Sequence, residues 1–212
     1  EQTHIIDSFE IPRWWNRYVV LDHGHRNPTA VLFFATDGDG DIYIYDCHYE
    51  ANQWIDYHAE QIWLKVRQDH ITRWLADPSI FHVRGGMSND VSIAAQYEDY
   101  GIFFERADND KQAGIDRVAQ YIKVDPVLNK PRLFVFNKPA LDPFIEEITD
   151  YRWEDFKVSL NSKEEPRKVG DHAMDCLRYA INHFEESGMR LPRNIPPEWL
   201  SNKNNKDSWK LV

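Results

Sequence analysis

The sequence is poor in cysteine and glycine, and it has no long apolar run. Its two cysteines, Cys47 and Cys176, lie in apolar segments without zinc-site spacing, so we expect small buried residues in a reducing compartment. No apolar run approaches the roughly 20 residues of a membrane-spanning helix, and the start does not resemble a signal peptide, so we expect no membrane partner. The 9 glycines form no GxxxxGK[ST] phosphate-binding loop, which argues against a P-loop ATPase site in this sequence.

The composition is typical of a single well-packed domain. The chain has 212 residues, of which 42% are hydrophobic and 14% aromatic, including 8 tryptophans. A chain of this length buries about 70% of the surface that it exposes when unfolded, so we expect an extensive core rather than disorder. The formal net charge of −10 argues against strong non-specific binding to nucleic acid, although a cluster of carboxylates that holds cations would contribute to that charge.

The segment around which the chain is organised is RYVVLDHGHRNPTAVLFF, residues 17–34. A short β-rich run ends at Asp22, and a polar turn of strand-ending residues follows. Residues 30–35 return as a second strand, and a DGDGD turn leads into a third strand over residues 42–49. The pattern predicts a meander of three strands with a lone carboxylate at the end of the first, an arrangement that can position a metal ion.

Helical and extended patterns alternate after this meander. The first helix is expected from Asn52, as its N-cap, to about His70. Alternation of this kind predicts an α/β domain with a mixed sheet flanked by helices. The further expected elements are strands over residues 71–76, 102–105 and 132–136, and helices that start at 88–90, span 115–124, span 141–148 and open at Gly170 and Asp171.

Aspartates stand at three places where a metal site could form. Asp22 ends the first strand, Asp77 ends the strand over residues 71–76, and Asp171 and Asp175 are four residues apart on one face of the last helix. Carboxylate oxygens are the ligands that Mg²⁺ and Mn²⁺ prefer. Two such ions about 4 Å apart can activate a water and stabilise the leaving oxygen in phosphodiester cleavage.

Each of these aspartates also has an ordinary structural explanation. Asp22 and Asp77 precede turn residues and would serve as turn formers. Asp171 is the natural N-cap of its helix, and Asp175 could form a surface ion pair with Arg178 that is worth little. The pattern of residues by itself leaves both explanations open.

The combination of motifs resembles a known family. The succession of DHGHRNPTA, DPS, GIDRV and DHAMDCLRYA is similar to the C-terminal nuclease domain of the terminase large subunit of tailed bacteriophages, from about Phe9 to Phe184. The resemblance implies a ribonuclease H-like fold, closest to Holliday-junction resolvases. It also implies a metal-dependent endonuclease that cuts concatemeric double-stranded viral DNA at the start and end of packaging.

The same resemblance implies roles for the aspartates. Asp22 would bridge two Mg²⁺ or Mn²⁺ ions, Asp77 would be the second ligand, and the DHAMD segment would supply the third. Within that segment Asp171 and Asp175 are both candidates, and His172 is a further candidate ligand. The ambiguity arises because related domains often carry adjacent aspartates at this helix start, whereas resolvases use the position equivalent to Asp175, sometimes with a histidine three positions earlier.

Boundaries and partners follow from the resemblance as well. Residues 1–16 would be a lead-in from a missing N-terminal ATPase domain, which fits a chain that begins with Glu1 rather than methionine. Residues 17–188 would form the nuclease domain, and residues 189–212 a C-terminal tail. The portal and the small terminase subunit would be partners in the full assembly, in the cytoplasm of the bacterial host.

Basic side chains near the expected cleft are candidates for contacts with DNA phosphates. Arg26 lies in the turn after the first strand, and the polar loop over residues 151–168 falls where the family carries a loop beside the active site. An ordinary solvated loop explains that segment equally well, since acidic residues are interspersed with its basic ones. The candidates in or next to this loop are Lys163, Arg167 and Lys168.

Three other functions compete with the packaging nuclease. A junction resolvase of the same fold would act as a dimer on four-way junctions. An actin-like phosphotransferase also opens with a strand and an Asp-x-Gly turn, but it needs further glycine-rich phosphate loops that this sequence lacks. A non-catalytic docking module, in which the carboxylates are caps and turns, would bind DNA without cleaving it.

Overall fold

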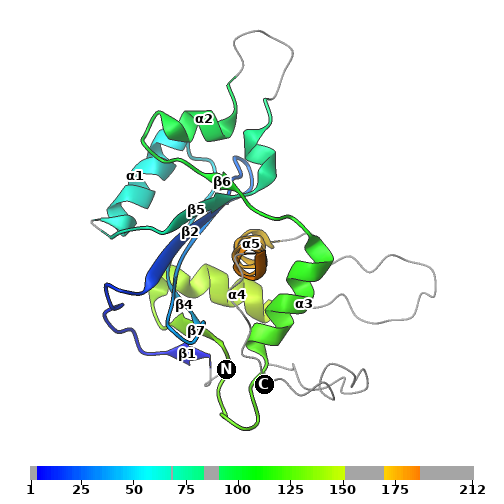
Figure 1. The fold of residues 1–212 in the computed structure, drawn as a ribbon. Helices are drawn as coiled ribbons and strands as arrows, with labels where there is room; N and C mark the ends of the chain where they lie inside the picture. The colour runs from blue at the N-terminus through cyan, green and yellow to red at the C-terminus, as the bar shows by residue number, and fades with distance from the viewer. Residues whose placement is uncertain (1–3, 68, 84–90, 151–169, 187–212) are drawn as a thin grey trace, which may run out of the picture.

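The structure, a computed structural model, describes residues 4–67, 69–83, 91–150 and 170–186. A sheet lies between two layers of helices, with α1 and α2 on one face and α3, α4 and α5 on the other (Figure 1). The strands are β1 Ile5–Ile6, β2 Asn16–Asp22, β3 Thr29–Thr36, β4 Ile42–Glu50, β5 Arg73–Ala76, β6 Glu105–Arg106 and β7 Leu133–Phe136. The helices are α1 Ile55–Val66, α2 Ile93–Glu98, α3 Lys111–Ile122, α4 Asp142–Asp150 and α5 His172–Glu186, with 3₁₀ turns η1 Pro78–Phe81 and η2 Pro139–Leu141.

The strands form one mixed sheet in the order β1-β7-β4-β3-β2-β5-β6. The neighbours β2, β3 and β4 are antiparallel, and the remaining pairs are parallel. Every residue of β3 is buried, because this central strand is covered by helices on both faces. The predicted α/β class, the mixed sheet and the early three-strand meander are confirmed.

The parallel pairing of β2 with β5 brings two of the candidate aspartates to the same edge. Leu21 pairs with Ala76, and the backbone N–H of Asp77 donates to the carbonyl of Leu21 at 3.0 Å. Because parallel strands end at the same edge of a sheet, Asp22 and Asp77 leave the sheet next to each other. The prediction that both aspartates stand at the ends of strands is therefore confirmed.

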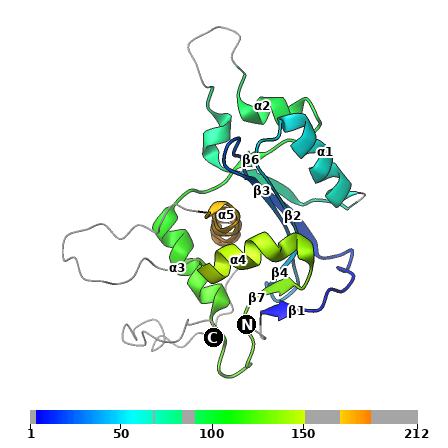
Figure 2. The same cartoon turned by 180° about the vertical axis from the view of Figure 1, so that it is seen from behind.

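Helix α5 is the inner helix of its layer. It packs on β2, β3 and β5 and also contacts α3 and α4, and it is seen end-on between these elements in Figures 1 and 2. Its small and apolar side chains allow this close approach to the sheet. Cys176 is among the buried residues of this face and Cys47 is buried in β4, both as free thiols. The buried residues of the α5 face include Ala173, Cys176, Leu177, Ala180 and Ile181.

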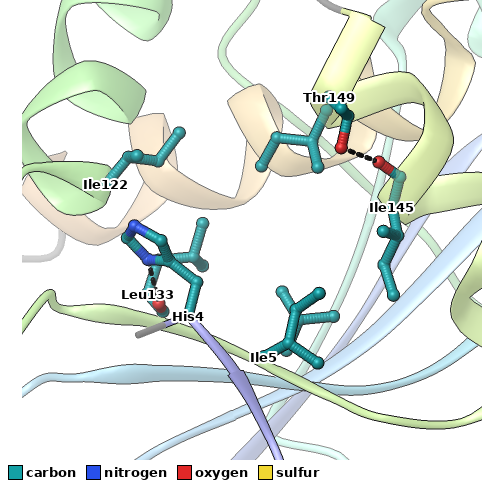
Figure 3. Close-up of a pocket in the computed structure, with 8 residues that line it drawn as sticks. His4, Ile5, Ile122, Leu133, Ile145 and Thr149 are labelled. Atoms are coloured by element: carbon teal, nitrogen blue, oxygen red, sulfur yellow. Dashed lines mark hydrogen bonds between the residues drawn. The ribbon is translucent and has the colours of Figure 1, made fainter. Parts of the chain in front are cut away.

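The N-terminal residues that the structure describes also pack on this domain. Ile5 and Ile6 pair in parallel with β7 as the edge strand β1. The ring of Phe9 lies 4.9 Å from that of Phe136 and 5.9 Å from that of Trp15. A small apolar cavity of about 40 Å³ lies beneath β1, between β7, α3 and α4 (Figure 3). Aliphatic side chains, Thr149 and His4 line this cavity, and none of the candidate aspartates is among its lining residues.

Several predicted boundaries are wrong. The first helix begins at Ile55 with Trp54 as its N-cap, because the N–H of Asn52 donates to the backbone carbonyl of His25 in the turn between β2 and β3, and the φ of Asn52 is +59°. Helix α2 starts at Ile93, capped by Ser92, so the start predicted at 88–90 is too early. The strand predicted over 102–105 is only the two-residue β6, and α3 begins at Lys111, before the predicted start.

No helix among the described residues has the length and apolar character needed to cross a bilayer.

Gly114 permits α3 and α5 to approach each other closely. A Cβ at this position would lie 2.2 Å from Cγ and 2.8 Å from Cδ of Arg178, and Arg178 is only 4% exposed. Any side chain at Gly114 would therefore have to displace a buried arginine from its place between the two helices.

We expect Gly114→Ala to destabilise the fold in spite of the better helix propensity of alanine. The propensity gain is about 1 kcal/mol, whereas overpacking of a buried contact costs about 1–3 kcal/mol. A net loss lowers the melting temperature by a few degrees for a domain of this size. Thermal unfolding measures it, with Gly38→Ala as the control because a Cβ there would meet nothing within 4 Å. An unchanged melting temperature for Gly114→Ala would contradict this account of the α3–α5 contact.

Candidate metal centre

Asp22 and His172 meet across the interface between β2 and α5. The Oδ2 atom of Asp22 lies 2.8 Å from Nδ1 of His172. Burial raises the pKa of the Asp22 carboxyl above its ordinary value, the hydrogen bond to His172 opposes this, and the charges of Asp77 and Asp171 raise it further. The hydrogen bond to Asp22 raises the pKa of His172, although burial acts in the opposite direction. The predicted first ligand and the predicted histidine are thus in direct contact.

Asp77 is held from two sides. Its Oδ1 atom accepts the N–H of Ser79 at 2.7 Å, which makes it the N-cap of η1. Its Oδ2 atom accepts a hydrogen bond from the hydroxyl of Tyr179, one of the buried residues of α5. The turn-forming role that the sequence suggested is therefore real, but it uses only one of the two carboxylate oxygens. Each of these oxygens keeps a further lone pair.

Asp175 pairs with Arg178 within α5, and this pair is not at the surface. The Oδ1 atom of Asp175 lies 2.8 Å from Nη2 of Arg178, whose side chain is 5% exposed. Arg178 also donates from Nη1 to Asn109 at 3.1 Å and lies over the ring of Tyr179. The surface ion pair considered from the sequence is corrected to a largely buried one, because α3 and the segment before it cover the guanidinium.

The acidic side chains repel one another. Burial is the largest cause that raises the pKa of Asp175, Arg178 opposes it, and the charges of Asp171 and Asp22 add to it. Asp77 and Asp171 act in the same direction on Asp22. A cluster of partly buried like charges is unfavourable unless a cation neutralises it. The pairing of β2 with β5 and the contact of His172 with Asp22 bring the segments that carry these four aspartates to one edge of the sheet.

The donor set suits a hard divalent cation. Mg²⁺ and Mn²⁺ take carboxylate oxygens and retain several waters, so they do not require an all-protein cage. Within the described ranges, no three histidine, cysteine or acidic side chains are already arranged as a metal site. The side-chain partners that now occupy these carboxylates are His172, Tyr179 and Arg178. The residues present therefore fit a metal site in which the ion retains part of its water shell. Binding of the ion would replace some of the hydrogen bonds and ion pairs that these carboxylates now make.

The histidines of the turn after β2 lie on the other side of the sheet. His23 hydrogen-bonds through Nδ1 to the hydroxyl of Tyr97 at 3.1 Å and packs edge-on against His58. A groove of about 380 Å³ lies between this turn and the helices α1 and α2, with the exposed indole of Trp54 beside His25. His23 thus contacts α2, whereas the neighbouring Asp22 contacts α5 on the opposite face of the sheet.

Of the predicted DNA contacts, only Arg26 lies within the described residues. It is exposed in the turn that follows Asp22. The polar loop over residues 151–168 lies outside the described residues, and so do Lys163, Arg167 and Lys168.

Two residues that contact the site escaped the sequence reasoning. Tyr179 is four positions after Asp175, so the helical period would have placed it on the same face. Glu147 on α4 accepts the backbone N–H groups of Ala173 and Met174 at 2.8 and 3.1 Å. No local sequence signal distinguishes Glu147 from its acidic neighbours, since its contact depends on how α4 packs against α5.

Comparisons with known proteins point to one family. Residues 22–183 match the family described as Terminase RNAseH like domain. No curated protein sequence matches the chain.

Solved structures share the fold. The large terminase of a thermophilic bacteriophage, in complex with ADP, is 22% identical with a TM-score of 0.67, over 85% of this chain and 42% of that one. The P22 large terminase nuclease domain is 21% identical with a TM-score of 0.65, over 87% and 89% of the two chains. The large terminase nuclease of thermophilic phage G20c with bound cobalt is 12% identical with a TM-score of 0.55, over 85% and 93%. The match thus spans less than half of the ADP-bound large terminase but nearly all of the two nuclease domains.

Proposed function

We propose that this chain, which belongs to the terminase RNase H-like domain family, is a divalent-metal-dependent endonuclease that cuts concatemeric double-stranded DNA for a viral packaging motor. The fold is that of the terminase nuclease domains. The metal ions, the substrate and the packaging role are the parts that we propose.

One observation carries the proposal. Asp22 and Asp77 leave adjacent parallel strands at the same edge, and the start of α5 brings Asp171, His172 and Asp175 to that edge from a distant part of the sequence. Burial and the charges of neighbouring carboxylates raise the pKa of Asp22 and of Asp175, and shifts of this kind occur preferentially at functional sites. A structural role does not require such repulsion, whereas binding of a divalent cation relieves it.

The proposed ligands are Asp22, Asp77, Asp171 and Asp175, with His172 as a further candidate. Two bound Mg²⁺ or Mn²⁺ ions would supply an activated water and would stabilise charge on the leaving oxygen. The protein's own contribution is to hold the carboxylates in place. The hydrogen bonds described above do this, since Asp77 is oriented from η1 and α5 and Asp175 is oriented by its buried arginine partner. Thiolate ligands are not part of the proposal, because both cysteines are buried as free thiols and burial raises the pKa of each.

Binding of DNA would rely on local basic groups rather than on the whole chain. The net charge of −10 disfavours non-specific binding, and we propose that the exposed Arg26, in the turn that follows Asp22, contacts a DNA phosphate. We propose the same role for Lys163, Arg167 and Lys168. An ATPase domain of the same polypeptide, the portal and the small terminase subunit would supply further contacts in the cytoplasm of the bacterial host.

The decisive experiment is cleavage of supercoiled plasmid by the whole chain in Mg²⁺, Mn²⁺, Ca²⁺ or EDTA. We expect nicked and linear products in Mg²⁺ or Mn²⁺ and none in EDTA, because the carboxylates alone cannot activate a water for attack on phosphorus. Agarose gel electrophoresis resolves the three plasmid forms. Intact plasmid in every metal would contradict the proposal.

The rival functions give different results in the same assay. A resolvase would cut a four-way junction in preference to linear duplex, and a docking module would bind DNA without cutting it in any metal. The comparisons found terminase nucleases, which favours the packaging nuclease over both rivals and over an actin-like phosphotransferase.

A further inference from the structure

The start of α5 has to satisfy two demands at once. The first N–H groups of a helix have no partner within the helix and need an acceptor, usually the side chain of the N-cap residue. Asp171 occupies that position in the sequence, and it is also one of the proposed metal ligands. A carboxylate that caps its own helix points back over the helix end. In that orientation it could not bind a metal ion together with the aspartate on β2.

Glu147 meets the capping demand from another helix. Its Oε2 atom accepts the N–H groups of Ala173 and Met174 at 2.8 and 3.1 Å. These are the second and third residues of α5, whose N–H groups an N-cap side chain normally bonds. The next N–H, that of Asp175, donates to the carbonyl of Asp171 at 2.8 Å in the ordinary helical pattern.

Glu147 is itself held in place. The hydroxyl of Tyr49, on β4, donates to its Oε1 atom at 2.5 Å. Each oxygen of the carboxylate thus has a defined partner, one on the sheet and one on α5. The pair of contacts fixes the start of α5 relative to α4 and β4.

We propose that Glu147 is a positioning residue of the metal centre: it caps α5 from α4 and so leaves the carboxylate of Asp171 available to a divalent cation. The role of Asp171 as a ligand rests on the proposed function. The capping of α5 by Glu147 in place of Asp171, called the capping exchange below, does not. The N-cap role that the sequence suggested for Asp171 is, on this proposal, transferred to a residue 24 positions earlier in the chain.

A thermal-stability cycle in EDTA tests the capping exchange without any metal. The variants are Glu147→Ala, Asp171→Ala and the two combined, each compared with the wild-type chain. We expect Asp171→Ala alone to leave the melting temperature unchanged or to raise it, because it removes repulsion with Asp22 and Asp175. In the Glu147→Ala background the same change should lower the melting temperature by a few degrees, because Asp171 then caps the helix. Equal losses from Asp171→Ala in both backgrounds would overturn the proposal.

Titration calorimetry with Mn²⁺ alone tests the consequence for the metal. We expect Glu147→Ala to weaken binding roughly 10–100-fold, the usual effect of removing a group that orients a ligand. Glu147→Gln should bind within a few-fold of the wild-type chain, because its amide oxygen can accept the same N–H groups. Glu146→Ala, at the neighbouring position on α4, is the control for the change of charge. Wild-type affinity in Glu147→Ala, or an equal loss in Glu147→Gln, would overturn the positioning role.

The two experiments separate the two proposals. If the wild-type chain neither binds Mn²⁺ nor cuts DNA, the proposed function fails and with it the positioning role. The stability cycle still decides whether Glu147 replaces Asp171 as the cap of α5.

Discussion

Asp22→Asn is expected to lower metal-dependent cleavage of plasmid DNA by at least about 10³-fold while the chain stays folded. Asp22 is the proposed ligand that both ions share, and metal-ion stabilisation of the transition state is worth several kcal/mol, with each 1.36 kcal/mol a factor of about ten in rate. The asparagine keeps the shape of the side chain and an oxygen for His172, and it removes repulsion with Asp77 and Asp171. Initial rates of nicking at saturating Mg²⁺ or Mn²⁺, with a melting curve for each variant, measure both effects.

Asp46→Asn is the matched control for this prediction. Asp46 also lies on a strand and pairs with one basic residue, Lys65, and its side chain is 25% exposed compared with 17% for Asp22. It is on β4, where its Oδ1 atom also accepts the N–H of Cys47, and it is not one of the proposed ligands. We expect its cleavage rate to stay within a few-fold of the wild-type rate. Full activity in Asp22→Asn would contradict the role of Asp22 as a metal ligand and would leave it as a turn residue.

Tyr179→Phe should weaken both the fold and the activity, although the residue touches no substrate in the proposed mechanism. Its hydroxyl donates to the Oδ2 atom of Asp77, which is 8% exposed. Loss of a hydrogen-bond donor to a buried charged group costs about 1–3 kcal/mol, equivalent to several degrees in melting temperature. We also expect a roughly 10–100-fold lower cleavage rate, because Asp77 loses the contact that orients it as a ligand. Melting curves and initial rates at saturating metal measure the two losses.

Tyr45→Phe makes the same chemical change at a place where it should do no harm. Tyr45 is buried in β4, and its hydroxyl has no hydrogen-bond partner among the described residues. Removal of an unsatisfied buried hydroxyl is neutral or stabilising, so we expect an unchanged or higher melting temperature and normal cleavage. If Tyr179→Phe behaved like this control, the contact with Asp77 would have no role in the site.

Local sequence determined the elements of this fold and several of its site residues. The short β-rich apolar runs before and after the polar turn at Asp22 predicted the meander β2–β4, because a strand that is covered on both faces needs such a run. Strand-ending residues marked Asp22 and Asp77, and the four-residue spacing of Asp171 and Asp175 placed both on one face of α5. These signals are local, since each depends on residues within a few positions of one another.

Only the tertiary structure decided what these aspartates contact. The parallel pairing of β2 with β5 places Asp22 beside Asp77, and the packing of α5 on that edge brings His172 to Asp22 across 150 positions of sequence. The same packing buries Arg178, which local reasoning placed at the surface, and it brings Glu147 to the N–H groups at the start of α5. Hydrogen bonds and charge interactions of this kind depend on which elements meet in space, and a periodic pattern within one segment carries no information about its partners in another.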